Sequence, residues 1–126
     1  MKVQFACSLN LEYMVNCSPK VLYNRLSSAS GLAEWFADDV SVNGKKYTFL
    51  WDNVEQEAEL AFRKENLIVR FNWLHDETYF EFKITRDELT GDVSLLITDF
   101  ADDDEIDEIR TLWDSQIATL KHVLGS

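Results

Sequence analysis

The side chains that could do chemistry in this 126-residue chain are few, and they do not form a familiar catalytic set. His75, Asp76 and Glu77 are consecutive, and each could ligate a metal ion. Consecutive side chains in a strand or turn point in different directions, whereas a metal gathers its ligands around one point in a defined geometry. We therefore interpret this run as a hydrated turn and predict no metal site there.

A second acidic run, at residues 102–105, could suggest calcium. A calcium loop alternates its ligands around a central glycine, and this run lacks that pattern. The run lies at the start of a predicted helix, where the helix dipole favours negative charge. His122, near the carboxyl end of the same helix, suits the dipole in the same way. Both features are interpreted as structural.

Cys17 directly precedes a helix start at Ser18-Pro19, where main-chain N–H groups can lower the pKa of a thiol. No histidine is close in sequence, and a free cysteine commonly behaves as a small buried apolar residue, so an inert thiol is favoured. Cys7 and Cys17 are too few for a disulfide framework, and an extended strand would hold them apart. No glycine-rich phosphate loop, nucleophile elbow or histidine-containing triad spacing occurs. The sequence therefore predicts no catalytic residue and no cofactor.

Composition excludes several classes of function. The chain has 12 basic and 23 acidic residues, a formal charge of −11, whereas binding nucleic acid or an anionic membrane needs clustered lysine and arginine. A content of 46% hydrophobic residues, 16 of the side chains being aromatic, excludes intrinsic disorder. No signal peptide pattern and no apolar run long enough for a membrane helix is seen. We expect a cytoplasmic protein, free of membrane insertion and nucleic acid, with a single domain over residues 1–126.

The hydropathy period predicts the elements that position these residues. Residues 3–13 alternate apolar and polar side chains, as in a strand with one buried face. Two short helices follow, one capped by Ser18 with Pro19 at its first position, the other over residues 30–37 with Ser30 as its cap.

From Val40 the period returns to two, and the strong hairpin signal Asn43-Gly44 separates the first two strands. The predicted strands are residues 40–42, 45–51, 55–63, 67–73, 79–84 and 93–100, and Asp52-Asn53 forms a further turn. Residues 102–124 then switch to helical period, with one apolar stripe and Gly125 as a stop. That stripe is buried if the helix lies across the sheet.

This order of elements resembles the helix-grip fold of the START-like (SRPBCC) superfamily, in the branch of the activator of the heat-shock chaperone ATPase. The motifs that carry the resemblance are Ser18-Pro19-Lys20-Val21-Leu22-Tyr23, Leu32-Ala33-Glu34-Trp35-Phe36, Arg70-Phe71-Asn72-Trp73, and the last-helix residues Trp113, Ile117, Leu120 and Leu124. The resemblance covers essentially the whole chain, which is similar to small bacterial START-like proteins. It implies an α+β fold, in which a curved antiparallel sheet of about six to seven strands wraps a long C-terminal helix, with two short helices after strand one.

The branch often has Gly-Gly before the strand that follows Trp-Phe, where this chain has Val42-Asn43-Gly44-Lys45. The geometry of a cavity mouth is therefore not carried over. The superfamily has no shared catalytic set, so the resemblance implies a pocket and not a chemistry.

The candidate site is the apolar face shared by the sheet and the last helix. Large aromatic side chains can either fill such a space or leave a gap lined by ring faces. For Trp35 and Phe36, plain packing of a short helix is the favoured interpretation. The predicted lining residues are Trp35, Phe36, Phe49, Trp51, Phe62, Phe71, Trp73, Phe80, Phe82, Trp113, Ile117 and Leu120.

Three functions stay open, and the sequence favours a binding protein over an enzyme. The leading hypothesis is non-enzymatic binding of a small hydrophobic molecule, such as a lipid or aromatic metabolite. The second is a protein-interaction or co-chaperone-like module, whose negative charge would steer a basic partner. The third is a cyclase-like enzyme, which needs polar groups aimed into the cavity. The only polar side chains near the predicted cavity are those of Tyr47 and Thr78, at its edges. A buried carboxylate at Asp99 or Glu55 beside an open cavity would favour the enzyme.

Overall fold

The computed structural model of the chain describes residues 7–125, in which two short helices follow the first strand and a long helix ends the chain. Residues 3–6 of the predicted first strand lie outside that range. The elements are β1 (Cys7–Val15), α1 (Pro19–Ser27), α2 (Ala29–Leu32), β2 (Asp39–Asn43), β3 (Lys46–Trp51), β4 (Val54–Lys64), β5 (Ile68–Trp73), β6 (Tyr79–Arg86), β7 (Val93–Ala101), the 3₁₀ turn η1 (Asp103–Glu105) and α3 (Ile106–Leu124).

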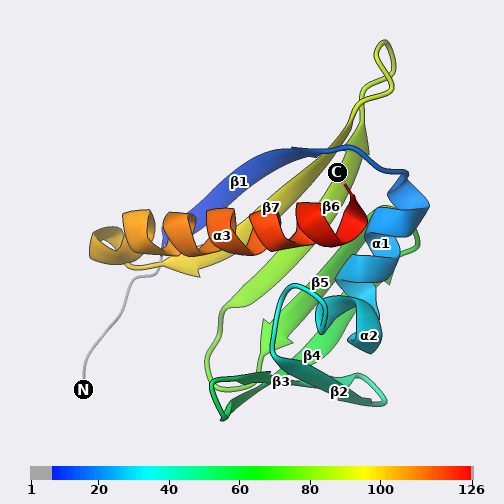
Figure 1. Cartoon of the computed structure of the whole chain (residues 1–126). Helices are drawn as coiled ribbons and strands as arrows, with labels where there is room; N and C mark the ends of the chain where they lie inside the picture. Colours follow the sequence, from blue (N-terminus) through cyan, green and yellow to red (C-terminus); the bar gives the residue numbers. More distant parts are fainter. Residues whose placement is uncertain (1–6, 126) are drawn as a thin grey trace.

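The strands form one seven-stranded sheet in the order β1-β7-β6-β5-β4-β3-β2. Every neighbouring pair is antiparallel, and β1 lies beside the last strand, β7. Figure 1 shows the sheet curving around α3, with α1 and α2 beside the carboxyl end of that helix. We call the sheet face that carries these helices the inner face. This is the helix-grip fold that the resemblance implies, and the prediction of the fold is confirmed.

Helix α1 begins as the sequence predicts. Pro19 occupies the start of the helix, and the hydroxyl of Ser18 accepts a 3.3 Å hydrogen bond from the main-chain N–H of Val21. Leu22 and Leu26 are one turn apart on the helix and are both buried. The N-terminal cap therefore fixes where the helix starts, and the two leucines fix which side faces the sheet.

The cap of α2 differs from the prediction. Ser28, not Ser30, is its N-cap, and its hydroxyl accepts a 3.0 Å hydrogen bond from the N–H of Gly31. The same hydroxyl donates to the carbonyl of Asn24 in α1, at 2.7 Å. Ser28 thus joins the two helices, and α2 ends at Leu32, well before residue 37.

The first hairpin is also displaced by one residue. Asn43 pairs with Lys46, so the two turn residues are Gly44 and Lys45 rather than Asn43 and Gly44. Gly44 has a φ of 65°, a conformation that costs glycine little.

A β-bulge in β4 overturns the prediction that Phe62 faces the helix. Leu60 pairs with Phe71, but the next pair is Phe62 with Arg70, so the register shifts between Leu60 and Phe62. An extra residue in one strand reverses the face of every side chain beyond it. The side chain of Phe62 is 53% exposed, and it lies on the outer face of the sheet.

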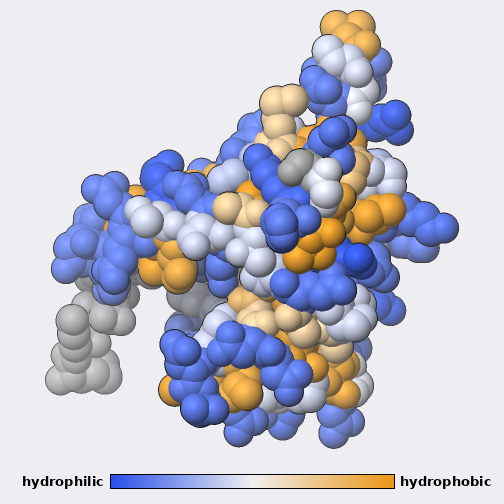
Figure 2. All heavy atoms as spheres, viewed as in Figure 1, coloured by the Kyte–Doolittle hydropathy of each residue, from blue (hydrophilic) through white to orange (hydrophobic). Residues whose placement is uncertain are grey.

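The long helix keeps the predicted period but starts after a 3₁₀ turn. Its buried residues are Trp113, Ile117 and Leu120, and it ends at Gly125, whose φ is 72°. No helix within residues 7–125 combines the length and the apolar character needed to cross a membrane. Figure 2 shows mostly polar residues on the outward side of α3, and an apolar tip on the projecting β6–β7 connection, where Leu89 is 97% exposed.

Candidate functional site

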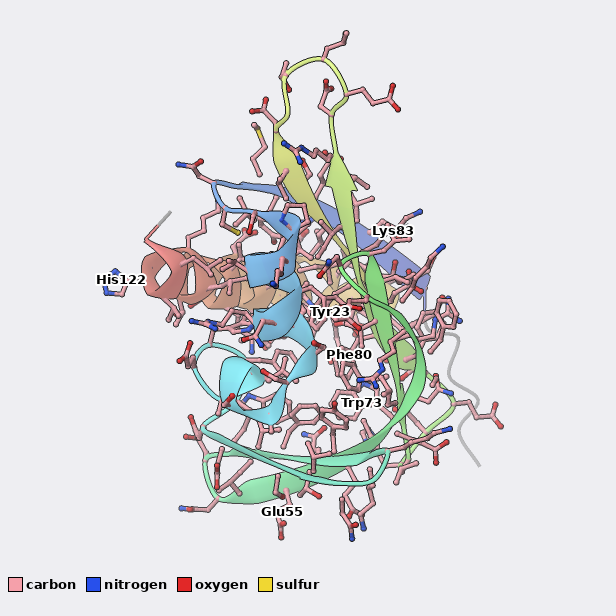
Figure 3. All side chains as sticks on the ribbon, turned by 90° about the vertical axis from the view of Figure 1, so that its right-hand side faces the viewer. Tyr23, Glu55, Trp73, Phe80, Lys83 and His122 are labelled. Atoms are coloured by element: carbon pink, nitrogen blue, oxygen red, sulfur yellow. The ribbon has the colours of Figure 1, made fainter. Side chains whose placement is uncertain are left out.

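Side chains fill most of the space between the sheet and α3. Nine of the twelve predicted lining residues are buried, and Phe49, Phe71 and Phe82 have 0% exposure, so no water-sized space touches these three rings. Figure 3 shows Phe80 and Trp73 on the inner side of the sheet, with Lys83 on the opposite side. The buried residues are Trp35, Phe36, Phe49, Phe71, Phe80, Phe82, Trp113, Ile117 and Leu120.

Phe36 lies at the centre of this aromatic cluster. Its ring centroid is 5.2 Å from the centroid of Phe80 on the sheet and 5.8 Å from that of Trp113 on α3. Its carbonyl accepts hydrogen bonds from Trp51 Nε1 at 2.7 Å and from Gln116 Nε2 at 3.0 Å. The segment after α2 is therefore fixed to both β3 and α3, and the ring of Phe36 fills the space that a ligand would need.

An open hollow of about 440 Å³ lies over Phe36, between α3 and the segment that follows α2. We call it the mouth hollow. It contains three of the predicted residues, Trp35, Phe36 and Trp51, and of these Trp51 keeps part of its side chain exposed. The full lining is Ala33, Glu34, Trp35, Phe36, Ala37, Asp38, Trp51, Gln116 and Thr119.

Sequence reasoning missed Gln116 and Thr119, the two residues that α3 contributes to the mouth hollow. Both are polar, whereas the prediction followed the apolar stripe of the helix. Their spacing of three residues places them together on one flank of that stripe. The flanks of an amphipathic helix could therefore have been included in the candidate set.

The remaining predicted residues lie outside the mouth hollow. Trp73 is partly exposed, and its ring centroid is 4.8 Å from that of Phe80 and 5.3 Å from that of His75. His75 lines a separate open hollow with Glu55, Gln56, Glu57 and Leu74. Phe62 is on the outer face, as described above.

Asp99 is the acidic residue among the inner-face positions of β7. Trp113 Nε1 donates a 2.8 Å hydrogen bond to its Oδ2, and the N–H of Phe100 donates a 2.8 Å bond to its Oδ1. Burial raises the pKa of Asp99 above its ordinary value, the hydrogen bonds from Trp113 and Phe100 lower it in part, and the charge of Asp76 raises it. Asp99 is thus a partly buried carboxylate, and it lines neither the mouth hollow nor the hollow beside His75.

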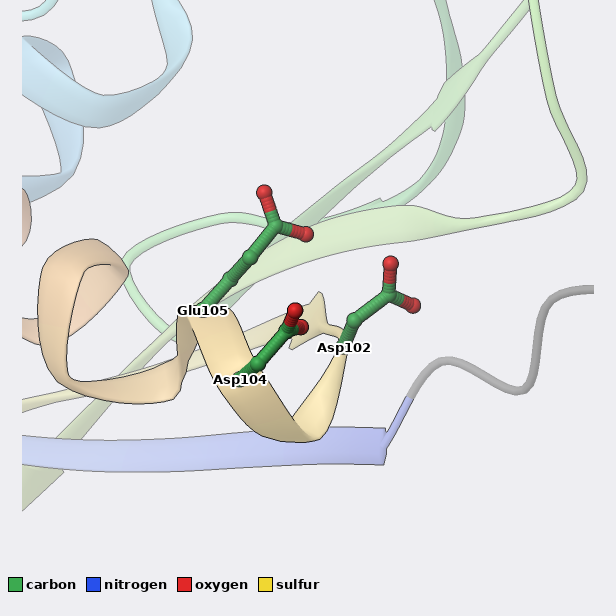
Figure 4. Close-up of side chains that lie close together, drawn as sticks. All are labelled: Asp102, Asp104 and Glu105. Atoms are coloured by element: carbon green, nitrogen blue, oxygen red, sulfur yellow. The ribbon is translucent and has the colours of Figure 1, made fainter.

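Three acidic side chains come together where β7 leads into α3 (Figure 4). One carboxylate oxygen from each of Asp102, Asp104 and Glu105 lies within 4.8 Å of the others. The charge of Asp102 is the largest cause of a raised pKa at Glu105. Asp104 and Glu105 are exposed at the start of a helix, where the dipole favours negative charge.

The two cysteines are free and their thiols are not activated. Burial raises the pKa of Cys17, and this outweighs the lowering by the N–H of Leu22 at the helix start. Cys7 Sγ donates a 3.0 Å hydrogen bond to Asp103, which raises the pKa of that thiol as well. His122 projects from the exposed end of α3 (Figure 3).

A curved antiparallel sheet closed over one long helix, with an aromatic interior and an opening beside that helix, defines a helix-grip domain. The chain belongs to the START-like superfamily, because a model of the START-like superfamily domain matches residues 4–126. The resemblance stated from the sequence is therefore confirmed. A search of curated proteins finds no match.

Solved structures share the fold of this chain. The chain is 37% identical to BfR322 from Bacteroides fragilis, with a TM-score of 0.68, over 94% of this chain and 91% of that one. The Aha1 dimer from Colwellia psychrerythraea shares the fold at 18% identity and a TM-score of 0.77, over 91% and 93% of the two chains. DynU16, from the dynemicin biosynthetic locus, does so at 13% identity and a TM-score of 0.79, over 94% of this chain and 47% of its own.

Proposed function

We propose that this protein binds a small, largely apolar molecule at the mouth hollow, without catalysing its conversion. The observation that carries the proposal is the partly exposed indole of Trp51 in the wall of a hollow of about 440 Å³ beside α3. Ligand sites are concave, and aromatic side chains line them preferentially. START-like domains generally bind hydrophobic ligands, which supports the same function.

The filled interior limits where such a molecule would sit. Because Phe36 occupies the centre of the aromatic cluster and is 4% exposed, the ligand rests on the surface side of this ring. It contacts Trp51 rather than the rings of Phe49 or Phe82, which are fully buried. Deeper entry requires the ring of Phe36 to move, and the hydrogen bonds from Trp51 and Gln116 to its carbonyl oppose a shift of its main chain.

A titration with 1-naphthalenemethanol, an uncharged bicyclic aromatic probe, tests this site. Its fluorescence should change saturably with added protein, and the indole N–H signal of Trp51 should shift in a ¹H–¹⁵N spectrum. W51L removes the ring face but keeps an apolar side chain, and should weaken binding about two- to tenfold. F62A, which alters the aromatic residue on the outer face, should bind as the wild type does. Equal affinity in W51L and the wild type, or no saturable signal, would contradict the proposal.

A second candidate function, protein interaction, is favoured by the exposure of Phe62 on the outer face. Aromatic side chains, phenylalanine among them, are enriched in protein interfaces. Sedimentation and cross-linking of the wild type and F62S, at low and high salt, test this function. If the wild type forms no complex, or if F62S forms the same complexes as the wild type, this function is contradicted.

A further inference from the structure

The charged side chains of the mouth hollow are all acidic. Glu34 and Asp38 both line it, and none of its lining residues is lysine, arginine or histidine. The two carboxylates differ in their surroundings. Glu34 forms a 2.8 Å ion pair with Nε of Arg25, whereas Asp38 forms no ion pair with any basic side chain of residues 7–125. Asp38 therefore supplies the uncompensated charge of the hollow.

Asp38 is fixed beside Trp51 by the strand that carries this indole. The main-chain N–H of Asp38 donates a 2.8 Å hydrogen bond to the carbonyl of Leu50, on one side of Trp51. Its Oδ2 accepts a 2.8 Å hydrogen bond from the N–H of Asp52, on the other side. Asp38 is thus held to both main-chain neighbours of Trp51, and the two residues line the same hollow.

The polar donors around the hollow already have partners. Trp51 Nε1 and Gln116 Nε2 both donate to the carbonyl of Phe36. The hydroxyl of Thr119 donates to the carbonyl of Ser115, and Trp35 Nε1 donates to that of Arg25. The hollow consequently offers a ligand negative charge and a partly exposed aromatic residue, and both attract a cation.

We propose that the ligand of the mouth hollow carries a positively charged ammonium group, which lies between the carboxylate of Asp38 and the indole of Trp51. This inference rests on the proposed function, because it specifies the class of ligand for the same site. The formal charge of −11 on the chain supports it, since a negative field raises the local concentration of cations.

A matched pair of probes tests the charge alone. 1-Naphthylmethylammonium and 1-naphthalenemethanol have the same bicyclic ring and differ in the charged group. The wild type should bind the ammonium probe about three- to tenfold more tightly than the alcohol, as expected when a cation meets an exposed carboxylate and an aromatic face. The preference should fall as salt is added.

D38N and D39N separate the local charge from the net charge. Both remove one negative charge, but Asp39 lines a different hollow, and its side chain bonds to the N–H of Val40. The amide oxygen in D38N can still accept the hydrogen bond from Asp52, and circular dichroism checks that the variant folds. D38N should lose most of the preference for the ammonium probe and bind the alcohol as the wild type does, whereas D39N should keep the preference.

The outcomes distinguish this inference from the proposed function. If the wild type binds both probes with equal affinity, or if D39N loses the preference as fully as D38N, the inference is wrong and the binding site stands. If neither probe binds saturably at Trp51, the proposed function fails and the inference fails with it.

Discussion

Trp113 Nε1 in α3 donates a 2.8 Å hydrogen bond to Oδ2 of Asp99 in β7. This bond ties the long helix to the sheet at the one acidic inner-face position of β7. On the neighbouring strand β1, the residue paired with Asp99 is the buried Leu9. The carboxylate is partly buried, and within residues 7–125 it forms no ion pair with a basic side chain.

This arrangement predicts a pH-dependent contribution of Asp99 to stability. Burial raises the folded-state pKa of Asp99 above its ordinary value of 3.8. The fold therefore favours the protonated form, and its contribution to the free energy of unfolding is present below about pH 3.8 and is lost as the pH rises through the folded-state pKa. Relative to the wild type, D99N should become more stable as the pH rises from about 4 towards neutrality, measured by urea unfolding at each pH.

The charge of Asp76 provides the control for this prediction, because it raises the pKa of Asp99. In a D76N background, the difference in the free energy of unfolding that D99N causes should change less with pH. A difference that changes in the opposite direction with pH would show that the carboxylate is stabilised, not destabilised, by its surroundings.

The hydrogen bond itself predicts coupling between Trp113 and Asp99. W113F removes the donor and leaves Oδ2 without this partner, at a cost of about 1–3 kcal/mol beyond the lost packing. In D99N the partly buried charge is gone, so W113F should cost less. A double-mutant cycle by urea unfolding should give a coupling energy of about 0.5–3 kcal/mol. Costs that add within about 0.3–0.5 kcal/mol would contradict a coupled pair.

The sequence predicts the architecture because hydropathy period is a local property. Alternation in the strands and the stripe of residues 106–124 give the elements, and a sheet followed by an amphipathic helix leaves few ways to bury both apolar faces. The positive φ of Asp52 and Asn53 shows that turn chemistry can also be read locally.

The details that could not be predicted depend on contacts between elements. The bulge that turns Phe62 outward shows only in the pairing of β4 with β5. Whether the interior is open or filled depends on Phe36, whose position is set by hydrogen bonds from Trp51 and Gln116, far away in sequence. The carboxylate of Asp38 acquires its role in the candidate site through the same tertiary packing.

The opposite orientations of Phe36 and Phe62 predict very different costs of truncation. F36A removes a ring that is 4% exposed and packed against six aromatic neighbours, and it should lower the free energy of unfolding by about 3–5 kcal/mol. F62A removes a ring that is 53% exposed, and it should change this free energy by about 0.5 kcal/mol or less. Urea unfolding of both variants measures the difference. Similar losses would mean that Phe62 faces the helix after all.

The junction between α1 and α2 gives a last prediction, because Ser28 and Ser30 are two residues apart and only one of them caps. The hydroxyl of Ser28 accepts from Gly31 N–H at 3.0 Å and donates to the carbonyl of Asn24 at 2.7 Å. S28A loses both bonds and should destabilise the protein by about 0.5–2 kcal/mol. Ser30 is exposed inside α2, where alanine has the higher helix propensity, so S30A should be neutral or slightly stabilising. Thermal and urea unfolding of the two variants compare the positions, and a larger loss in S30A would restore the cap that the sequence predicted.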